Sequence, residues 1–329
     1  MLDVRFAGDK LNPVWLAPLA GITVPAVRRF FKRLGAGLTH TEMVSCAGLV
    51  HGSKKTFRML ETLNEDPPVV LQLFAGSEEV LLRGAEVALK EDRWAAISIN
   101  MGCPMPKVLK KGAGAALLKK PEEAERMVKS LSLLGKPVWV KIRKLSDNYA
   151  DTFSFIEKML NAGAVHVSLH GRTPAQKYEG LADRNVVYEA ARMFPGYIGG
   201  SGDVFSVDDG LGYLKNGCVS VLLARGAIKD PFMFPNILHR LGYEVDSCYL
   251  SNSIDVRIKT FRDFAYDVKE EAGEKVALIL IKRLVSGMFR GFNGVSSFRR
   301  DVGSAKNWEG FETALRNFSD NVERGRELC

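Results

Sequence analysis

The chain has 329 residues, of which 46% are hydrophobic and 26% charged, and its formal net charge is +8. Such a length allows one large domain with a smaller one, or two medium domains, and the composition is that of a globular protein. No apolar run reaches the roughly 18–20 residues of a membrane span, and the opening residues do not resemble a secretory signal. Five scattered cysteines without a C-x-x-C pair predict neither a disulfide framework nor a zinc site. A reducing cytoplasm therefore suits the chain best.

Short apolar runs alternate with helical patterns along the first 240 or so residues. We interpret eight of them as strands, at residues 14–18, 38–42, 69–74, 96–100, 138–143, 165–170, 197–200 and 220–224. Ser77 is a candidate N-cap for the helix that follows it, and Pro121 lies near the first turn of another. Eight buried strands alternating with helices predict an α/β fold, a (β/α)8 TIM barrel. A doubly wound open sheet is the main alternative, and the count of eight favours the barrel.

The pattern changes after residue 242, where strands are no longer predicted. Residues 257–273, 275–292 and 308–328 read as three or four helices. The sequence thus predicts a barrel domain at residues 1–242 and a smaller helical domain at 243–329, with the boundary between Leu241 and Ser253.

The positive charge is concentrated in two stretches that contain no acid. Residues 101–120 carry five lysines in a glycine-rich, flexible loop, and residues 281–300 hold Lys282, Arg283, Arg290, Arg299 and Arg300. One such stretch is commonly a solvated face. Two of them, each mixed with glycine, favour an anionic ligand such as phosphate or nucleic acid.

Polar groups gather where the predicted strands end, which is where TIM barrels carry their function. Gly-Gly-Ser-Gly-Asp follows the seventh strand and Ala-Arg-Gly-Ala the eighth. Glycine lets backbone amides approach an anion, and Arg225 can clamp a phosphate through two parallel bonds. Lys141 and His170 can donate hydrogen bonds to a polar cofactor. Because no G-x-G-x-x-G follows the first strand, a Rossmann dinucleotide site is not indicated.

These motifs resemble the tRNA-dihydrouridine synthase family. The segment N-x-G-C-P-x-x-K-V, residues 100–108, with its trailing G-A-G-A-x-L, is specific to that family, and the resemblance covers about residues 14–234. It implies an FMN-dependent reductase that uses NADPH or NADH, with a helical domain that helps to hold tRNA. Reduced FMN would supply a hydride to uracil, and Cys103 would be the general acid that supplies the proton.

The resemblance also implies roles for individual residues. The expected cofactor contacts are Pro18, Leu19, Ala20, Gln72, Lys141, His170, Ser201, Gly202, Asp203, Ala224 and Arg225. From the chemistry and charge of the residues themselves we expect substrate contacts at Asn100, which could read the uracil edge, and at the cationic side chains Lys107, Arg172, Arg283 and Arg290. The chain departs from the family pattern at Ser201, Ala224 and Val24, where asparagine, glycine and aspartate are usual.

Two other classes of function stay open at this point. One is an FMN-dependent dehydrogenase of a free pyrimidine, and the other is a non-catalytic RNA-binding protein on the same fold. The lysine loop and the cationic tail argue against the first, and the intact Cys103, Lys141 and His170 against the second. We expect no metal, no membrane association and no protein partner. The sequence predicts neither the uridine that is modified nor the oligomeric state.

Overall fold

A parallel barrel forms the centre of the molecule in a computed structural model, which describes residues 5–6, 9–62 and 68–327. Its eight strands are β3 (Val14–Leu16), β4 (Thr39–His40), β6 (Val69–Phe74), β7 (Ala96–Met101), β8 (Val138–Arg143), β9 (Ala164–His170), β10 (Ile198–Ser201) and β11 (Ser220–Leu223). They pair in parallel in the order β3-β11-β10-β9-β8-β7-β6-β4, and a bridge between Trp15 and Leu38 joins the two end strands. All eight predicted strands are present, so the TIM barrel is confirmed and the open sheet is wrong.

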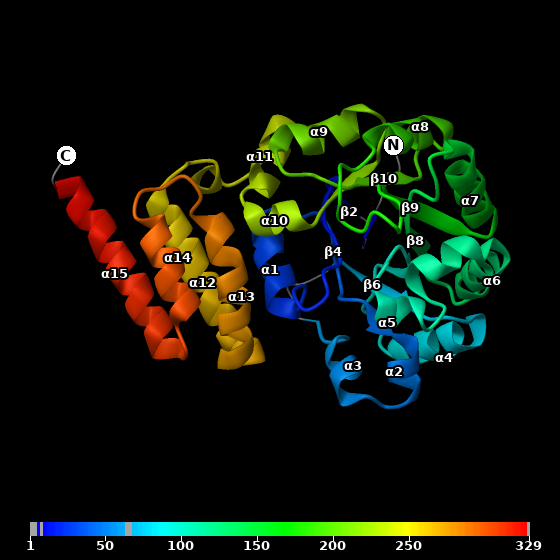
Figure 1. Cartoon of the computed structure of the whole chain (residues 1–329), viewed down its shortest axis with the longest axis horizontal. Coiled ribbons are helices and arrows are strands. Elements are labelled where there is room, and N and C mark those ends of the chain that lie inside the picture. The colour runs from blue at the N-terminus through cyan, green and yellow to red at the C-terminus, as the bar shows by residue number, and fades with distance from the viewer. Residues whose placement is uncertain (1–4, 7–8, 63–67, 328–329) are drawn as a thin grey trace.

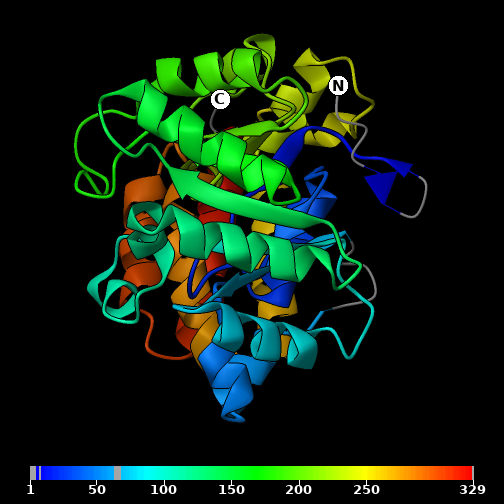
Figure 2. The same cartoon turned by 90° about the vertical axis from the view of Figure 1, so that its right-hand side faces the viewer.

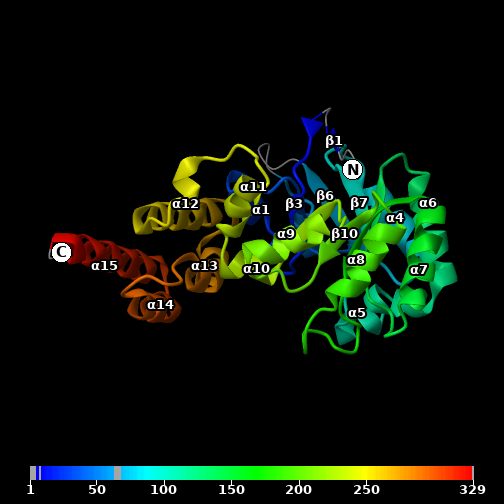
Figure 3. The same cartoon turned by 90° about the horizontal axis from the view of Figure 1, so that it is seen from above.

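Helices cover the outside of the barrel (Figures 1 and 2). The longer ones are α1 (Pro25–Arg33), α4 (Glu78–Ala88), α6 (Pro121–Ser132), α7 (Tyr149–Asn161), α8 (Arg184–Met193), α9 (Val207–Lys215) and α11 (Met233–Arg240). The short elements are β1 (Arg5–Phe6), β2 (Asp9–Lys10), β5 (Val44–Ser45), α2 (Cys46–Val50), α3 (Lys54–Arg58), α5 (Pro106–Leu109), α10 (Arg225–Lys229) and the 3-10 helices η1 (Gly114–Lys119) and η2 (Ser247–Tyr249). The strand pair β1–β2 and α5 lie on opposite sides of the molecule (Figure 3).

Two helix starts test the local predictions. Pro121 is the first residue of α6, as expected. Ser77 occupies the N-cap position of α4, but its side chain makes no capping hydrogen bond. The N-cap position of Ser77 is thus confirmed, while the Glu78 N–H donates to the Glu123 carboxylate at 2.9 Å in place of a bond to the serine hydroxyl. The Glu123 side chain, from the neighbouring helix α6, therefore satisfies an N–H group at the start of α4 that has no partner within the helix.

Aromatic side chains fill the inside of the barrel. Trp15 and Trp139 stack with ring centroids 5.1 Å apart, and His40 and His166 pack against them. Burial lowers the pKa of His40 to about 4 and that of His166 to about 3, so both imidazoles are neutral at pH 7. The barrel is therefore a packed core, and a ligand can enter only at its ends.

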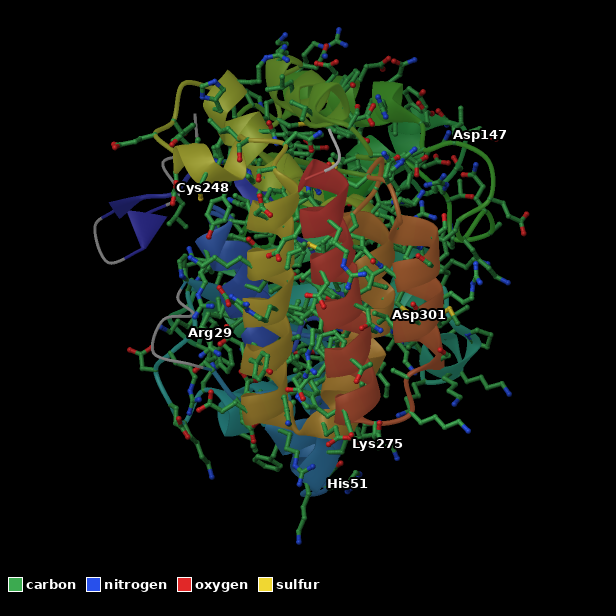
Figure 4. The ribbon with its side chains drawn as sticks, turned by 90° about the vertical axis from the view of Figure 1, so that its left-hand side faces the viewer. Arg29, His51, Asp147, Cys248, Lys275 and Asp301 are labelled. Atoms are coloured by element: carbon green, nitrogen blue, oxygen red, sulfur yellow. The ribbon has the colours of Figure 1, made fainter. Side chains whose placement is uncertain are left out.

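Four helices follow the barrel and pack beside it (Figures 1 and 4). They are α12 (Ile254–Ala272), α13 (Glu274–Met288), α14 (Val295–Ser304) and α15 (Trp308–Glu327). Phe264 of α12 contacts Phe30 of α1 with a centroid distance of 4.8 Å, and Arg33 pairs with Asp267 at 2.6 Å. Buried Arg257 donates to the Met288 carbonyl at 2.7 Å and so ties α12 to α13. We call these four helices the helical region.

No helix within the described ranges is long and apolar enough to cross a membrane.

Candidate active site

A cavity opens at the carboxyl ends of the barrel strands. Its lining comes from the ends of β3, β6, β7, β8, β9, β10 and β11 and from the loops that follow them. Cys103, Asn100 and all eleven expected cofactor contacts line it. The structure thus brings residues from position 18 to position 225 around one space. Lys107, Arg172, Arg283 and Arg290 are not part of this lining.

Cys103 lies in a turn that three separate segments hold in place. Its N–H donates to Asn100 Oδ1 at 2.9 Å, and its carbonyl accepts from the Ala115 N–H at 3.0 Å. The preceding carbonyl, of Gly102, accepts from Arg143 Nε at 2.8 Å. The thiol is unpaired and half-buried at the cavity. Such support fixes where a general acid presents its proton.

The lysine-rich stretch after Cys103 is not the open loop that we expected. It folds into α5 and η1, and the glycine–alanine run is largely buried. Gly114 has φ +62°, and a Cβ there would lie 2.6 Å from the Cys103 carbonyl oxygen. Glycine is needed because η1 packs directly against the cysteine turn. The lysine side chains of the stretch point outward and are exposed.

Asn100 supports the site, and its amide is saturated. Its Oδ1 accepts from the Gly102 and Cys103 N–H groups, at 3.2 and 2.9 Å. Its Nδ2 donates to Gln72 Oε1 at 2.9 Å and to Met43 Sδ at 3.0 Å. An amide has two donor hydrogens and two acceptor positions, and all four are used. In this arrangement the Asn100 amide holds the cysteine turn and Gln72, and a contact between Asn100 and the uracil edge stays a prediction.

Three side chains leave hydrogen-bond donors for a ligand. Gln72 is fully buried, and its Nε2 has no partner among the described residues. Lys141 makes no hydrogen bond or ion pair with any described residue; burial, with a contribution from nearby Arg143, lowers its pKa to about 8. His170 Nδ1 accepts from the Arg172 N–H at 3.3 Å, which leaves the proton on Nε2. Buried donors without partners are rare in proteins unless a ligand or water satisfies them.

His170 acts as a neutral donor. Burial lowers its pKa well below the ordinary value, and the cations Lys141, Arg143, Arg172 and Arg225 lower it further. The imidazole therefore stays uncharged at neutral pH, with one N–H available at the cavity that it lines.

The glycine loop after β10 is organised around Asp203. Its carboxylate accepts from Arg172 through two bonds, of 2.7 and 2.6 Å, and from Arg225 Nη2 at 2.9 Å. Burial alone would raise the pKa of Asp203, but the hydrogen bonds from Arg172 and Ala182 and the charges of both arginines hold it below its usual value. Asp203 has φ +47°, and Gly202 before it has φ +117°. This backbone turns sharply at the cavity edge.

The structure gives Arg172 partners within the protein. Only 2% of the residue is exposed, and besides Asp203 it donates to the Glu179 and Gly180 carbonyls. This arrangement favours a supporting role for the buried guanidinium, and its contact with the substrate stays a prediction. Arg225 is different, because its side chain is 40% exposed and lies over the Tyr178 and Phe205 rings. It keeps free N–H groups for a phosphate at the same edge.

The five cations of residues 281–300 divide into two groups. Ile281, Leu284, Val285 and Met288 are buried, as expected for the packed face of α13, while the cations are exposed. Lys282 Nζ donates to the Ala305 carbonyl at 2.7 Å, and Arg283 Nη1 to the Gly21 carbonyl at 2.8 Å. The guanidinium groups of Arg290, Arg299 and Arg300 make no hydrogen bond or ion pair to the residues that the structure describes. They are the cations left free for an external anion.

Several residues of the lining were not predicted. Arg143 lies two positions after Lys141 on β8, and the two-residue period of a strand places both on one side, which was a usable signal. Met43, Met105, Tyr178 and Phe205 also line the cavity but come from irregular loops, whose course no sequence period reveals.

Val24 is one of the departures from the family pattern. It occupies the N-cap position of α1 and makes no capping hydrogen bond, whereas an aspartate at this position could cap the helix.

Comparison with known proteins identifies the family of the chain. The family model for dihydrouridine synthase (Dus) matches residues 15–323. The chain is 27% identical over 316 residues to a probable tRNA-dihydrouridine synthase of Treponema pallidum, covering 92% of each chain. It is 32% identical over 248 residues to a tRNA-dihydrouridine(47) synthase [NAD(P)(+)]-like protein of Oryza sativa subsp. japonica, covering 73% of this chain. That match spans only 36% of the rice protein.

Among solved structures, TcOYE with pHBA is similar in fold. The TM-score is 0.54 at 11% identity, and the match covers 75% of this chain and 92% of that one. At this identity the likeness concerns the barrel alone. Since the family model extends over most of the barrel and of the helical region, the chain belongs to the dihydrouridine synthase family.

Proposed function

We propose that the protein reduces a uridine of tRNA to 5,6-dihydrouridine, with bound FMN and with NADPH or NADH as electron donor. The observation that carries this proposal is the meeting of the Cys103 thiol with three unpartnered donors, Gln72, Lys141 and His170, in one cavity. Membership of the dihydrouridine synthase family supports it.

The residues present fit a flavin phosphate and its polar ring. Arg225 and the backbone around Gly202 would hold the phosphate, because they combine an exposed guanidinium with a glycine turn at the cavity edge. Gln72, Lys141 and the Nε2–H of His170 would donate to the carbonyl oxygens and nitrogens of the ring. When bound and reduced, FMN supplies a hydride to one carbon of the uracil 5,6 double bond.

Cys103 supplies the second hydrogen. Its S–H gives a proton to the other carbon of the double bond, and the resulting thiolate recovers a proton from water. Uracil gains one hydride and one proton, so the product is neutral dihydrouracil. Asn100 and Arg143 are positioning residues in this step, since both bond to the backbone of the cysteine turn and hold the thiol at the cavity.

The charged surfaces beside the cavity suit an RNA substrate better than a free base. Helix α5, which carries Lys107, and helix α14, which carries Arg299 and Arg300, lie on the same side of the molecule (Figure 3). In this proposal the two cationic surfaces contact phosphates on either side of a uridine that has left the base stack. The helical region, residues 243–329, then acts as the RNA-holding part, and residues 1–242 as the catalytic part.

A reducing compartment such as the cytoplasm suits this reaction, because Cys103 works only as a free thiol.

The test uses the purified full chain with FMN and NADPH, and measures dihydrouridine in tRNA by mass spectrometry. The tRNA comes from cells in which the corresponding gene is deleted. We expect dihydrouridine at defined positions, flavin absorbance in the protein, and no reduction of free uracil or orotate. Reduction of the free bases but not of tRNA would favour the free-pyrimidine enzyme. Absence of flavin would favour a non-catalytic RNA-binding protein.

A further inference from the structure

Helix α13 contacts the barrel at the wall of the cavity. Arg283 Nη1 donates to the Gly21 carbonyl at 2.8 Å, across 262 positions of sequence. Gly21 belongs to the loop that follows β3, and the four residues Ala17, Pro18, Leu19 and Ala20 of this loop line the cavity. We call residues 17–24 the β3 loop. A side chain that was expected to touch RNA is therefore bound to a cofactor-lining segment.

The Gly21 peptide groups are held from two sides. The Gly21 N–H donates to the Glu42 carboxylate, which comes from the segment after β4. The Gly21 carbonyl is held by Arg283, and the residue has φ +69°. The rest of the β3 loop is bonded within itself, through Thr23 and the Leu19 carbonyl, and to the barrel, where the Ala17 N–H donates to the Leu223 carbonyl and Arg28 Nη1 donates to the Thr23 carbonyl. The exposed tip at Gly21 thus takes one of its two outside contacts from the helical region.

A second contact lies one turn further along α13. A Cβ on Gly287 would be 2.2 Å from the Ile228 carbonyl oxygen and 2.4 Å from that of Lys229. These carbonyls end α10, the helix that begins with Arg225. Because positions four apart share one helix face, Arg283 and Gly287 present the same side of α13 to the barrel. That side touches the two segments, the β3 loop and α10, that follow the neighbouring strands β3 and β11.

We propose that Arg283 is a positioning residue for the cofactor cavity, through which α13 couples the helical region to flavin binding. The proposal rests on the proposed function in one respect, that a flavin occupies the cavity. Removing the Arg283 side chain frees the Gly21 carbonyl and lets the β3 loop move. A looser wall binds the flavin less tightly, because the ligand must then order the loop. Binding linkage is reciprocal, so flavin in turn stabilises the docked position of α13.

The test compares Arg283→Ala with Arg299→Ala in the full chain. Both remove one exposed arginine, but Arg299 makes no contact with the β3 loop. We expect Arg283→Ala to weaken FMN binding by roughly threefold to tenfold, the range of one hydrogen bond, and to alter the flavin absorption spectrum. Arg283→Lys should restore most of the affinity, because an ammonium can also donate to the Gly21 carbonyl. Arg299→Ala should leave FMN affinity unchanged.

Hydrogen exchange supplies a second measurement that needs neither flavin nor tRNA. Peptides covering residues 17–24 should exchange faster in Arg283→Ala than in the wild type or in Arg299→Ala. Unchanged exchange together with unchanged FMN affinity overturns the proposal and makes Arg283 an RNA contact only. Failure of the proposed function looks different, because the wild-type chain would then bind no flavin while the exchange difference at residues 17–24 would persist.

Discussion

At the scale of single residues, neighbouring side chains at the site have different roles. Cys103 carries the only thiol among the described residues of the cavity lining, and Asn100, Arg143 and Ala115 bond to its turn. Asn100 also bonds to Gln72, so one amide sets the position of the proposed acid and of a proposed cofactor contact. A substitution in this hydrogen-bond network would therefore affect more than one role at once.

Replacing Cys103 by alanine should nearly abolish uridine reduction while folding and flavin content stay intact. Loss of a general acid lowers rates by about 10² to 10⁴. Cys103→Ser should be as poor or nearly so, because a hydroxyl is a much weaker acid than a thiol. Single-turnover reduction of tRNA by the prereduced enzyme measures the step directly. A wild-type rate in the alanine variant would show that the proton comes from another group.

Lys141 should make flavin binding depend on pH. Burial, with a contribution from nearby Arg143, lowers its pKa to about 8 in the protein without flavin, so the amine loses its proton as the pH rises through this value. The charged form is the stronger donor to an electron-rich ring. FMN affinity should therefore be highest below pH 8 and fall above it, and binding near pH 8 should take up protons. Titration calorimetry in buffers of different ionisation enthalpy measures this uptake. Lys141→Gln should bind FMN weakly at every pH and lose the pH dependence.

The lowered pKa of Lys141 also makes the stability of the fold depend on pH. Between about pH 8 and the ordinary pKa of lysine, the unfolded chain holds a proton on this amine that the folded chain has lost. Stability contributed by Lys141 therefore rises with pH across this window.

Arg225→Ala should reduce FMN affinity by roughly tenfold to a hundredfold, the value of one charge-assisted phosphate contact. Riboflavin, which lacks the phosphate, is the control ligand, and its affinity should change much less. Equal losses of affinity for FMN and riboflavin would mean that the substitution disturbs the contacts to the flavin ring or the Asp203 loop, since Arg225 also pairs with Asp203.

At the scale of elements, the sequence was informative wherever a period or a fixed motif exists. The strands β6, β7, β8 and β9 were predicted within one residue, because each is a short, mostly apolar run of the length and composition that a buried parallel strand has. The donors Gln72, Lys141 and His170 were found because they stand on or at the ends of such strands. Contacts set by tertiary packing were not predictable. The Glu123 contact at the start of α4, the Asn100–Gln72 and Arg172–Asp203 bonds, and the Arg283–Gly21 bond all join segments that no local pattern relates.

We expect uridine reduction to require the 3-10 helix η1 as well as the cysteine turn that η1 packs against. Gly114→Ala places a Cβ 2.6 Å from the Cys103 carbonyl oxygen, so the turn or η1 must shift. A displacement of about 1 Å can lower a rate by about 10². Gly112→Ala is the matched control, because its φ of +70° is nearly the same as the +62° of Gly114 but its Cβ would meet nothing closer than 3.5 Å.

We expect Gly114→Ala to lose uridine reduction while keeping its flavin, and Gly112→Ala to keep both. The loss of stability should be larger in Gly114→Ala, because the steric clash adds to the strain at positive φ that the two variants share. Single-turnover rates, flavin absorbance and thermal unfolding separate these effects. Equal activities in the two variants would mean that η1 does not position Cys103.

At the scale of the whole molecule, the barrel and the helical region are joined next to the cavity. Arg257 links α12, α13 and the Asp230 carboxylate after α10, and Arg283 and Gly287 place α13 against the two walls of the site. Flavin binding is therefore not expected to depend on the barrel alone. Charge changes in the helical region must be chosen to avoid Lys282 and Arg283, whose side chains bind backbone carbonyls.

The three free arginines give the cleanest test of RNA binding. Replacing Arg290, Arg299 and Arg300 by glutamine should weaken tRNA binding and flatten the salt dependence of log K by about two units of log slope or a little more. Such contacts position the RNA without reading its sequence, so different tRNAs should lose similar affinity. Flavin content and NADPH oxidation without tRNA should not change, since none of the three side chains bonds to a described residue of the cavity wall.

The control removes equal charge from the opposite end of the barrel. Lys90, Arg192 and Lys215 are exposed at or just after the carboxyl ends of α4, α8 and α9, and helices of a TIM barrel run back away from the mouth. Their triple glutamine variant should keep the wild-type salt slope, measured by filter binding between about 50 and 200 mM salt. A flattened slope in the control would reveal a nonspecific effect of net charge. An unaltered slope in the arginine variant would leave the lysines of α5 and η1, beside Cys103, as the main RNA contact.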